Sequence, residues 1–343
     1  MSRFRSPFAP AVVTAILAVS LGLAACGGAS SEKSGESPQA VLNEATLRGI
    51  ESGNIDLSLG VKAPGSEGGD LDVSLSGPFQ GEGKGNLPRL DMTAQATGSV
   101  QGKEVDFEGG LVLLPNTAYV NYEGVEYEVD PSTYGFVEAT LNRAQRESGA
   151  QGGAAGAAAC QEEAGKLKVA DFIENGANEG SADVGGTATT KVSGDLNVSS
   201  AIDAVLEVAE SQACRVQLAA AGPLPSRAEV EKAKEELGTA VKSAHVDVYV
   251  GDDNIVRQIS AQLQIEPRNG GKGPKSAELD LELKLTGVNE EQTISAPEDT
   301  EPLNKLFRKL GINPIELLGV LQGEEGGEGL SKLLEGLAES QLH

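Results

Sequence analysis

Residues that could act in catalysis or ligate a metal are few and scattered along this sequence. Its two histidines are His245, at the start of an alternating segment, and His343, the last residue, so neither a histidine metal site nor a Ser/His/Asp arrangement is indicated. The glycine-rich residues 81–86 lack the strand, loop and helix order of a phosphate-binding loop and fit a hairpin turn better. Asp252-Asp253-Asn254 is too short for a calcium loop, and the acidic residues 323–329 are typical of a solvated linker. The sequence therefore predicts a protein that is not an enzyme and needs no metal or other cofactor.

The N-terminal cysteine stands where lipid chemistry is expected. A cationic start with Arg3 and Arg5 precedes an apolar stretch, residues 9–23, which is too short to span a membrane comfortably. The motif Leu23-Ala24-Ala25-Cys26-Gly27 ends this stretch and resembles the lipobox of bacterial lipoproteins. We therefore expect residues 1–25 to be a signal peptide and the sulfur of Cys26 to carry a diacylglycerol, which holds a protein more stably than one chain does. An ordinary secretory signal with an incidental cysteine is the alternative.

This interpretation places the mature protein on the extracytoplasmic face of the cell membrane, anchored by lipid. Loss of Arg3 and Arg5 with the signal peptide brings the net charge from −24 to −26. Nucleic acid is excluded as a partner because phosphate binding needs a cationic surface. Anionic headgroups would repel so acidic a body, so we expect it to stand off the membrane.

The other two cysteines, Cys160 and Cys214, form an even pair in an oxidising compartment. A disulfide between them is the simplest interpretation, and two free buried thiols are the alternative. Tryptophan is absent and aromatic residues make up only 3% of the chain. The core must therefore be built from aliphatic side chains, which is compatible with a packed interior and with a cavity.

Hydrophobic periodicity predicts an order of helix, strands, helices and strands. Residues 26–38 should be a flexible tether after the lipidated cysteine, and Ser37-Pro38 should begin a helix that runs to about residue 52. Two-residue alternation predicts strands over residues 55–61, 71–75, 90–97, 105–114, 118–122, 125–129, 186–198, 246–250, 259–265 and 279–285. Helical patterns cover residues 133–147, 201–212, 226–243, 303–310, 314–321 and 330–342. In the helix 201–212 we expect Ile202, Val205, Leu206 and Ala209 to face inward.

Several of these segments, in this order, resemble the LppX/LprG family of actinobacterial lipoproteins, which is related in fold to the LolA lipoprotein carrier. They are the first helix running into Ile55-Asp56-Leu57-Ser58-Leu59, then residues 183–196, 246–257, 283–289 and 294–297. The resemblance implies an α+β fold: a strongly curved antiparallel half-barrel with helices on its concave face. It makes residues 39–301 a lipid-binding domain of the LolA/LppX type and residues 302–343 a helical C-terminal extension.

The same resemblance implies a lipid or glycolipid held in a hydrophobic cavity, to be carried or presented in the cell envelope. The strand residues that we expect to line the cavity are Leu57, Leu59, Val73, Met92, Ala94, Val248, Ala261 and Leu263. The alternative is an envelope scaffold or assembly lipoprotein with a filled core. It would act through protein contacts, with a protein partner bound by residues 302–343.

Overall fold

The computed structural model describes residues 33, 35–65, 68–83, 87–100, 102–135, 160, 163, 165–212, 214–215, 227–266 and 275–311. The predicted signal peptide, Cys26, most of the helix 133–147 and the helices after residue 312 lie outside these residues. None of the described helices is both long and apolar enough to cross a bilayer.

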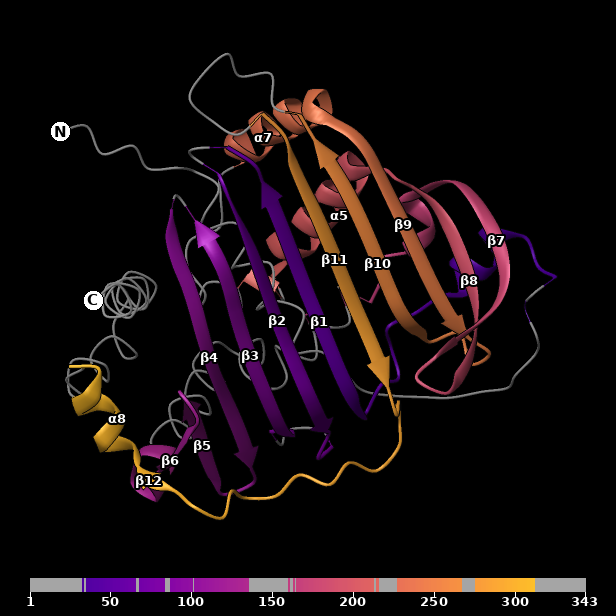
Figure 1. Cartoon of the computed structure of the whole chain (residues 1–343). Coiled ribbons are helices and arrows are strands. Elements are labelled where there is room, and N and C mark those ends of the chain that lie inside the picture. The colour runs from indigo at the N-terminus through magenta and orange to yellow at the C-terminus, as the bar shows by residue number, and fades with distance from the viewer. Residues whose placement is uncertain are drawn as a thin grey trace.

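The fold is organised around one twelve-stranded open sheet in the order β12-β6-β5-β4-β3-β2-β1-β11-β10-β9-β8-β7 (Figure 1). All neighbouring strands are antiparallel except β12 and β6, which are parallel. The strands from the first half of the chain are β1 (Ser52–Ala63), β2 (Gly69–Gln80), β3 (Arg89–Val100), β4 (Lys103–Leu114), β5 (Thr117–Tyr122) and β6 (Val125–Val129). Those of the second half are β7 (Ile173–Val184), β8 (Thr187–Leu196), β9 (Val241–Gly251), β10 (Val256–Ile265), β11 (Ala277–Thr286) and β12 (Glu301–Pro302).

The helices are short and gather on one side of the sheet. Helices α5 (Val198–Glu210) and α7 (Arg227–Ala240) lie behind β9–β11 in the view of Figure 1, where the sheet is open and curved. The remaining helical elements are α2 (Pro38–Glu44), the single turn η1 (Val169–Asp171) and α8 (Leu303–Lys309). The predicted α+β class and curved antiparallel half-barrel are confirmed.

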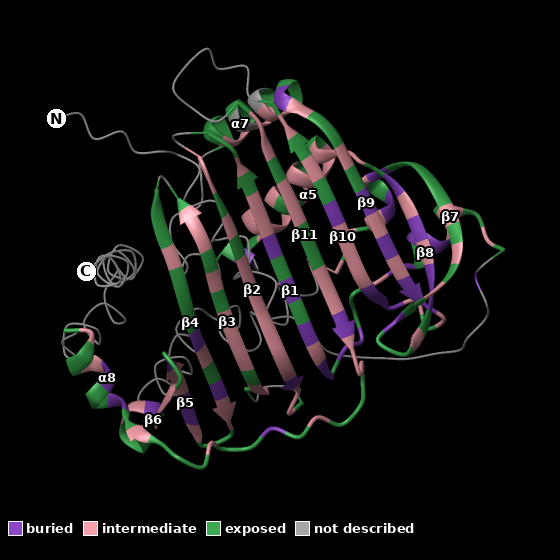
Figure 2. Cartoon of the chain, viewed as in Figure 1, coloured by how far each residue is buried: buried purple, intermediate pink, exposed green. Residues whose placement is uncertain are grey.

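Strand β1 joins the two halves of the sheet because it pairs on one side with β2 and on the other with β11. Leu57 lies opposite Leu75 of β2 and Leu283 of β11, strands that are far apart in the sequence. Along β1 the odd-numbered residues Ile55, Leu57 and Leu59 are buried, whereas Asp56 and Ser58 are exposed. The sheet therefore has one apolar and one polar face, as two-residue alternation requires (Figure 2).

Three packed clusters occupy the margins of the apolar face. On β8–β10, Val192, Val248 and Val250 pack against Val41 and Leu42 of α2. At the ends of β1, β2 and β11, Ile50 and Ile255 pack with Ile55, Phe79 and Leu285. On β5 and β6, the α8 residues Leu303 and Leu306 bury Tyr122 and Tyr127.

Helix α2 is shorter than the sequence predicted. Its start is as expected, since the hydroxyl of Ser37 accepts a hydrogen bond from the Ala40 amide at 3.2 Å and Pro38 occupies the first turn. The helix ends at Glu44 rather than near residue 52. The cause is pairing with the β9–β10 turn, in which the Thr46 amide donates to Asn254 O and the Val256 amide to Thr46 O, each at 2.9 Å.

Leu42→Ala should test how much α2 contributes to the core. Leu42 is buried among the β8–β10 valines, and loss of a buried leucine side chain costs about 2–4 kcal/mol. We expect urea unfolding to show a decrease of that size in the free energy of unfolding. The exposed neighbour Asn43→Ala is the matched control and should change it by less than about 0.5 kcal/mol. Equal effects of the two substitutions would show that α2 is not part of the core.

The predicted disulfide between Cys160 and Cys214 is confirmed, with a Cα–Cα distance of 4.5 Å. Cys214 lies just beyond the end of α5 and is fully buried. The disulfide therefore joins the C-terminal end of α5 to the segment that leads into η1 and β7.

The predicted C-terminal extension begins inside the fold. Helix α8 agrees with the helix predicted over residues 303–310, and its Leu303 and Leu306 are buried. Residues 287–300 reach it along one end of the strands (Figure 1), and on the way Ile294 packs with Val112 and Tyr119.

Candidate functional site

The centre of the apolar face is a continuous row of side chains that runs across the middle strands. Val73 of β2 lies opposite Leu59 of β1, which lies opposite Leu281 of β11, which lies opposite Ala261 of β10. Leu281 keeps 37% of its surface exposed although its neighbours are apolar. Leu281 could not be recognised as a site residue from the sequence, because only the pairing of β1 with β11 places it beside Leu59.

The eight residues predicted to line a cavity share this face, and their surroundings divide them. Val248 and Ala261 belong to the packed α2 cluster, Leu263 packs against it, and Met92 packs against the cluster around Ile50. Leu57, Leu59, Val73 and Ala94 belong to none of the packed clusters of described residues. Of these four, Leu57 and Leu59 are buried, whereas Val73 and Ala94 are half-buried.

Beside these four residues, the apolar face of β3 and β4 carries small residues, which project little from the sheet. Ala94 lies opposite Leu75 of β2 and Gly109 of β4, and Ala96 lies opposite Phe107. Phe107 is 38% exposed. A Cβ atom on Gly109 would come within 2.8 Å of the Phe107 ring, so glycine is what lets this ring lie over β4. The result is an apolar strip, here called the β1–β4 strip, that runs from the buried Leu57 and Leu59 over the half-buried Val73 and Ala94 to the partly exposed Phe107.

Helix α5 lies on the same side of the sheet and buries none of its residues. Its N-terminus is capped by Asn197, whose side chain accepts a hydrogen bond from the Ser200 amide at 3.0 Å. The prediction that Val205 faces inward is wrong, because Val205 is 61% exposed. Two ion pairs join α5 to α7, from Lys234 to Asp203 and from Arg227 to Glu210.

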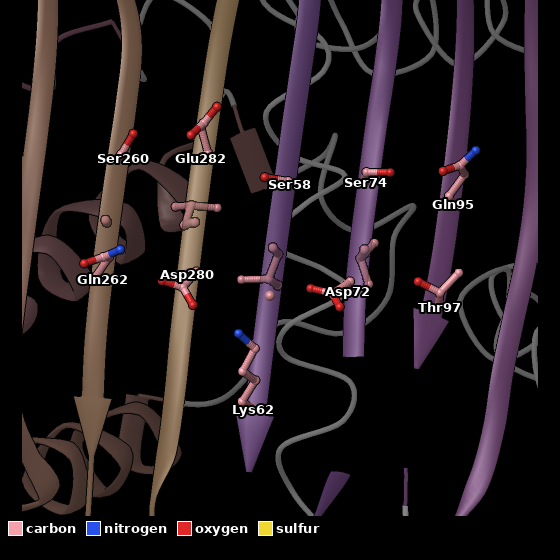
Figure 3. A pocket seen from close by; sticks show the side chains of 15 residues that line it. Ser58, Lys62, Asp72, Ser74, Gln95, Thr97, Ser260, Gln262, Asp280 and Glu282 are labelled. Carbon is pink, nitrogen blue, oxygen red and sulfur yellow. The ribbon is translucent and has the colours of Figure 1, made fainter. Parts of the chain in front are cut away.

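The polar face carries a hollow of about 490 Å³ around Gly60, which has no side chain (Figure 3). Gly60 lies opposite Asp72 on one side and Asp280 on the other, and Glu282 and Lys62 also line the hollow. Leu59, Val73, Ala261 and Leu281 border it from the same strands. An acyl chain would gain nothing in a site walled by carboxylates, because their desolvation costs more than the burial of the chain contributes. The polar hollow is therefore not the predicted lipid cavity.

His245 is placed by β9 on the polar face, half exposed, with its Nε2 3.3 Å from Asp247 Oδ1. Partial burial of Asp247 favours its neutral form, but hydrogen bonds from Ser193 and Lys191 outweigh this effect and hold the pKa of the carboxyl below its ordinary value. Asp247 thus lies between three polar groups in a structural network. Among the described residues, no three His, Cys, Asp or Glu side chains gather as a metal site. Asp253 of the predicted turn pairs with Arg257 at 2.6 Å.

The pKa values of two aspartates, Asp91 on β3 and Asp130 after β6, are shifted in opposite directions. Burial, followed by the charge of Glu126, raises the pKa of Asp91 above its ordinary 3.8. Hydrogen bonds from Ser132 and Thr133 lower the pKa of Asp130 to about 2. Asp91 therefore contributes stability at low pH that is lost as the pH rises through its folded pKa. Asp130 contributes stability that is lost as the pH falls from 3.8 towards 2.

Carboxyl ¹³C NMR on one sample should resolve both titrations. Glu126→Gln should lower the pKa of Asp91 and leave that of Asp130 unchanged, because only Asp91 senses the Glu126 charge. A common pKa for the two aspartates would contradict this assignment.

No protein-family model and no curated protein matches the chain. Among solved structures it is similar to the crystal structure of LprF from Mycobacterium bovis, with 14% identity over 79% of this chain and 99% of that chain and a TM-score of 0.32. It is also similar to the lipoprotein LppX from Mycobacterium tuberculosis, with 8% identity over 75% of this chain and 98% of that chain and a TM-score of 0.27. Both are lipoproteins of the LppX/LprG family, the family that the sequence resembles. With TM-scores this low, the likeness carries no argument about a site or a ligand.

Proposed function

We propose that this protein is a cell-envelope lipoprotein that binds a lipid or glycolipid on the apolar face of its sheet and carries or presents it. The observation that carries the proposal is the β1–β4 strip. It contains Leu57, Leu59, Val73 and Ala94, which belong to none of the packed clusters of described side chains, and Leu281 and Phe107 beside them keep 37% and 38% of their surface exposed. The strip lies on the side of the sheet that holds α5, a helix with no buried residue. A wide apolar surface of this kind is typical of a site for an apolar ligand.

The energy of an acyl chain in water explains why such a face is needed. At about 0.8 kcal/mol per CH₂ group, exposing a chain of ~16 carbons costs roughly 12 kcal/mol. A carrier must offset most of that cost, so the chain has to be covered on several sides. The β1–β4 face would supply one wall, and α5, which lies behind the neighbouring strands β9–β11, would border the chain on one side.

Transfer of a fluorescent phospholipid or glycolipid between two vesicle populations tests the carrier function. The protein for this assay lacks residues 1–25 and carries Cys26→Ser, so that it moves freely between vesicles. We expect the transfer rate to rise in proportion to protein concentration. A rate equal to that of vesicles alone, for neutral and anionic lipids alike, would contradict carriage and leave only presentation or the scaffold alternative.

The anchor is proposed to be a diacylglycerol on Cys26, on the extracytoplasmic face of the membrane. Mass spectrometry of the N-terminal peptide should find cleavage before Cys26 and the mass of the attached lipid. Cys26→Ser should abolish both the lipid and the membrane fractionation. An unmodified Cys26 in the mature protein would contradict the proposed anchor and would leave the proposed ligand site untested by this experiment.

The scaffold alternative depends on residues 302–343, and the position of α8 sharpens its test. Because Leu303 and Leu306 form part of a core cluster, deletion from residue 302 would damage the fold itself. Truncation after Gly311 leaves α8 in place. A carrier should keep its lipid after this truncation, whereas a scaffold acting through an envelope protein partner should lose that partner.

A further inference from the structure

The segment that follows the lipidated cysteine is held against the edge of the sheet. Asn178 of β7 donates from its side-chain Nδ2 to Glu36 O at 2.9 Å and to Lys33 O at 3.2 Å. The Glu36 amide in turn donates to Lys33 O at 3.0 Å. Residues that the sequence predicted as the last part of a flexible tether are therefore fixed to β7.

Asn178 is oriented by its own strand. Its Oδ1 accepts a hydrogen bond from the Gly180 amide at 2.9 Å, at a register shift between β7 and β8. The neighbouring Gly176 leaves room for Pro38, because a Cβ atom there would lie 3.3 Å from the proline ring. The irregular strand β7 thus offers both a hydrogen-bonding side chain and space for the segment that leads into α2.

Lys33 shows that this contact is specific. Its side chain is only 3% exposed, and its Nζ lies 3.1 Å from Glu44 Oε2 at the end of α2. A buried ammonium group requires a charged or hydrogen-bonding partner. We call this set of contacts, made by Lys33 and Glu36 with Asn178 and Glu44, the β7 dock.

The dock limits where the membrane can be. Only seven residue steps separate Cys26 from Lys33, and they reach at most about 25 Å when fully extended. The twelve strands, at about 4.8 Å between neighbours, extend over roughly 50 Å of sheet. A lipid on Cys26 therefore holds the β7 edge within about 25 Å of the bilayer, whereas nothing in the tether holds the β6 edge there.

We propose that the β7 dock orients the protein on the membrane that holds its anchor, with the β7–β8 edge toward the lipid surface and the edge formed by β6 and α8 pointing away. This inference rests on the proposed lipidation of Cys26. Glu174, Glu179, Asp183 and Asp195 give the β7–β8 edge a negative charge. Anionic headgroups repel such an edge, so the short tether, and not attraction to the surface, keeps it near the bilayer.

Energy transfer from a dye on the protein to labelled lipid tests this orientation. The full lipidated chain is reconstituted into phosphatidylcholine vesicles with either Ser181→Cys on β7 or Glu128→Cys on β6 as the only free thiol. We expect transfer to be roughly twofold more efficient, or better, from position 181 than from position 128, given the width of the sheet. Insertion of about ten Gly and Ser residues after Gly28 should remove most of this difference, because it roughly doubles the reach of the tether.

Hydrogen exchange tests the contacts of the β7 dock in the absence of a membrane. In the form that lacks residues 1–25 and carries Cys26→Ser, Asn178→Ala should speed hydrogen exchange of the Glu36 amide about tenfold. Lys33→Gln is a second variant with the same expectation, and Ser181→Ala, at an exposed position of β7, is the control. Unchanged exchange in both dock variants would overturn the dock.

The outcomes separate this inference from the proposed function. Equal energy transfer from positions 181 and 128 in lipidated protein would overturn the orientation alone. An unlipidated Cys26 would overturn the anchor and the orientation together, and lipid binding would remain to be judged by its own assays.

Discussion

Ala94→Trp is expected to reduce the amount of lipid bound per protein molecule about tenfold or more. Ala94 lies in the β1–β4 strip, opposite Gly109, and the next residue of β3 on the same face, Ala96, lies opposite the partly exposed Phe107. An indole ring there would occupy the volume proposed for an acyl chain. Displacing only two CH₂ groups into water costs ~1.6 kcal/mol, which corresponds to about a fifteenfold loss of affinity.

Gln95→Trp is the matched control, since Gln95 is the next residue on β3 and points to the polar face. Lipid extracted from both variants after purification is quantified against wild type, with urea unfolding as a check on folding. Undiminished lipid in a folded Ala94→Trp protein would rule out the β1–β4 strip as the binding site. An equal loss of lipid in both variants would indicate a general effect on folding instead.

Removal of the disulfide should have the largest effect on stability. Cys160 and Cys214 are 54 residues apart in the sequence, and closing a loop of that length lowers the entropy of the unfolded chain by an amount worth about 4 kcal/mol. The Cys160→Ala/Cys214→Ala protein should therefore unfold at a clearly lower urea concentration than the oxidised wild type. Because Cys214 lies just after α5, we expect the α5 amides to lose most protection from hydrogen exchange.

A dithiol reductant supplies the control for this prediction. It should lower the stability of the wild type to that of the double variant and leave the double variant unchanged. Equal urea midpoints for oxidised wild type and double variant would show that the disulfide contributes nothing to stability.

Most strands could be predicted because one face of each strand is polar and the other is apolar. In β11, Leu279, Leu281, Leu283 and Leu285 alternate with charged residues, and this period alone specifies a strand and the side that it buries. Strand β6 agrees with its predicted range. Alternation does not say which strand lies beside which, so the pairing of β1 with β11, which assembles the centre of the site, came only from the structure.

Strand β7 was missed because it is an edge strand and has little to bury. Its sequence is rich in Gly, Asn and Glu, and two register shifts interrupt its pairing with β8. Asn175 and Gly180 adopt positive φ angles of 52° and 87° at these shifts. Bulges and charges of this kind protect an exposed edge from pairing with other chains, and they also erase the two-residue period.

Long-range contacts explain the other differences. Residues after Glu44 have helical character in isolation, but the backbone of Thr46 pairs with Asn254 and Val256, more than two hundred positions away in the sequence. Val205 has the spacing of an inward residue, yet it is 61% exposed, because no described element covers that side of α5. Neither the dock at Asn178 nor the polar hollow at Gly60 carries a local sequence signal, because each is formed by segments that only the fold brings together.

Native mass spectrometry of the soluble form, without residues 1–25, with Cys26→Ser and purified from an envelope fraction, tests the central claim most directly. We predict a population of protein heavier than the chain by a discrete mass that organic extraction identifies as a lipid or glycolipid. A clean mass of the chain alone, unchanged after incubation with envelope lipids, would contradict lipid binding and favour the scaffold alternative.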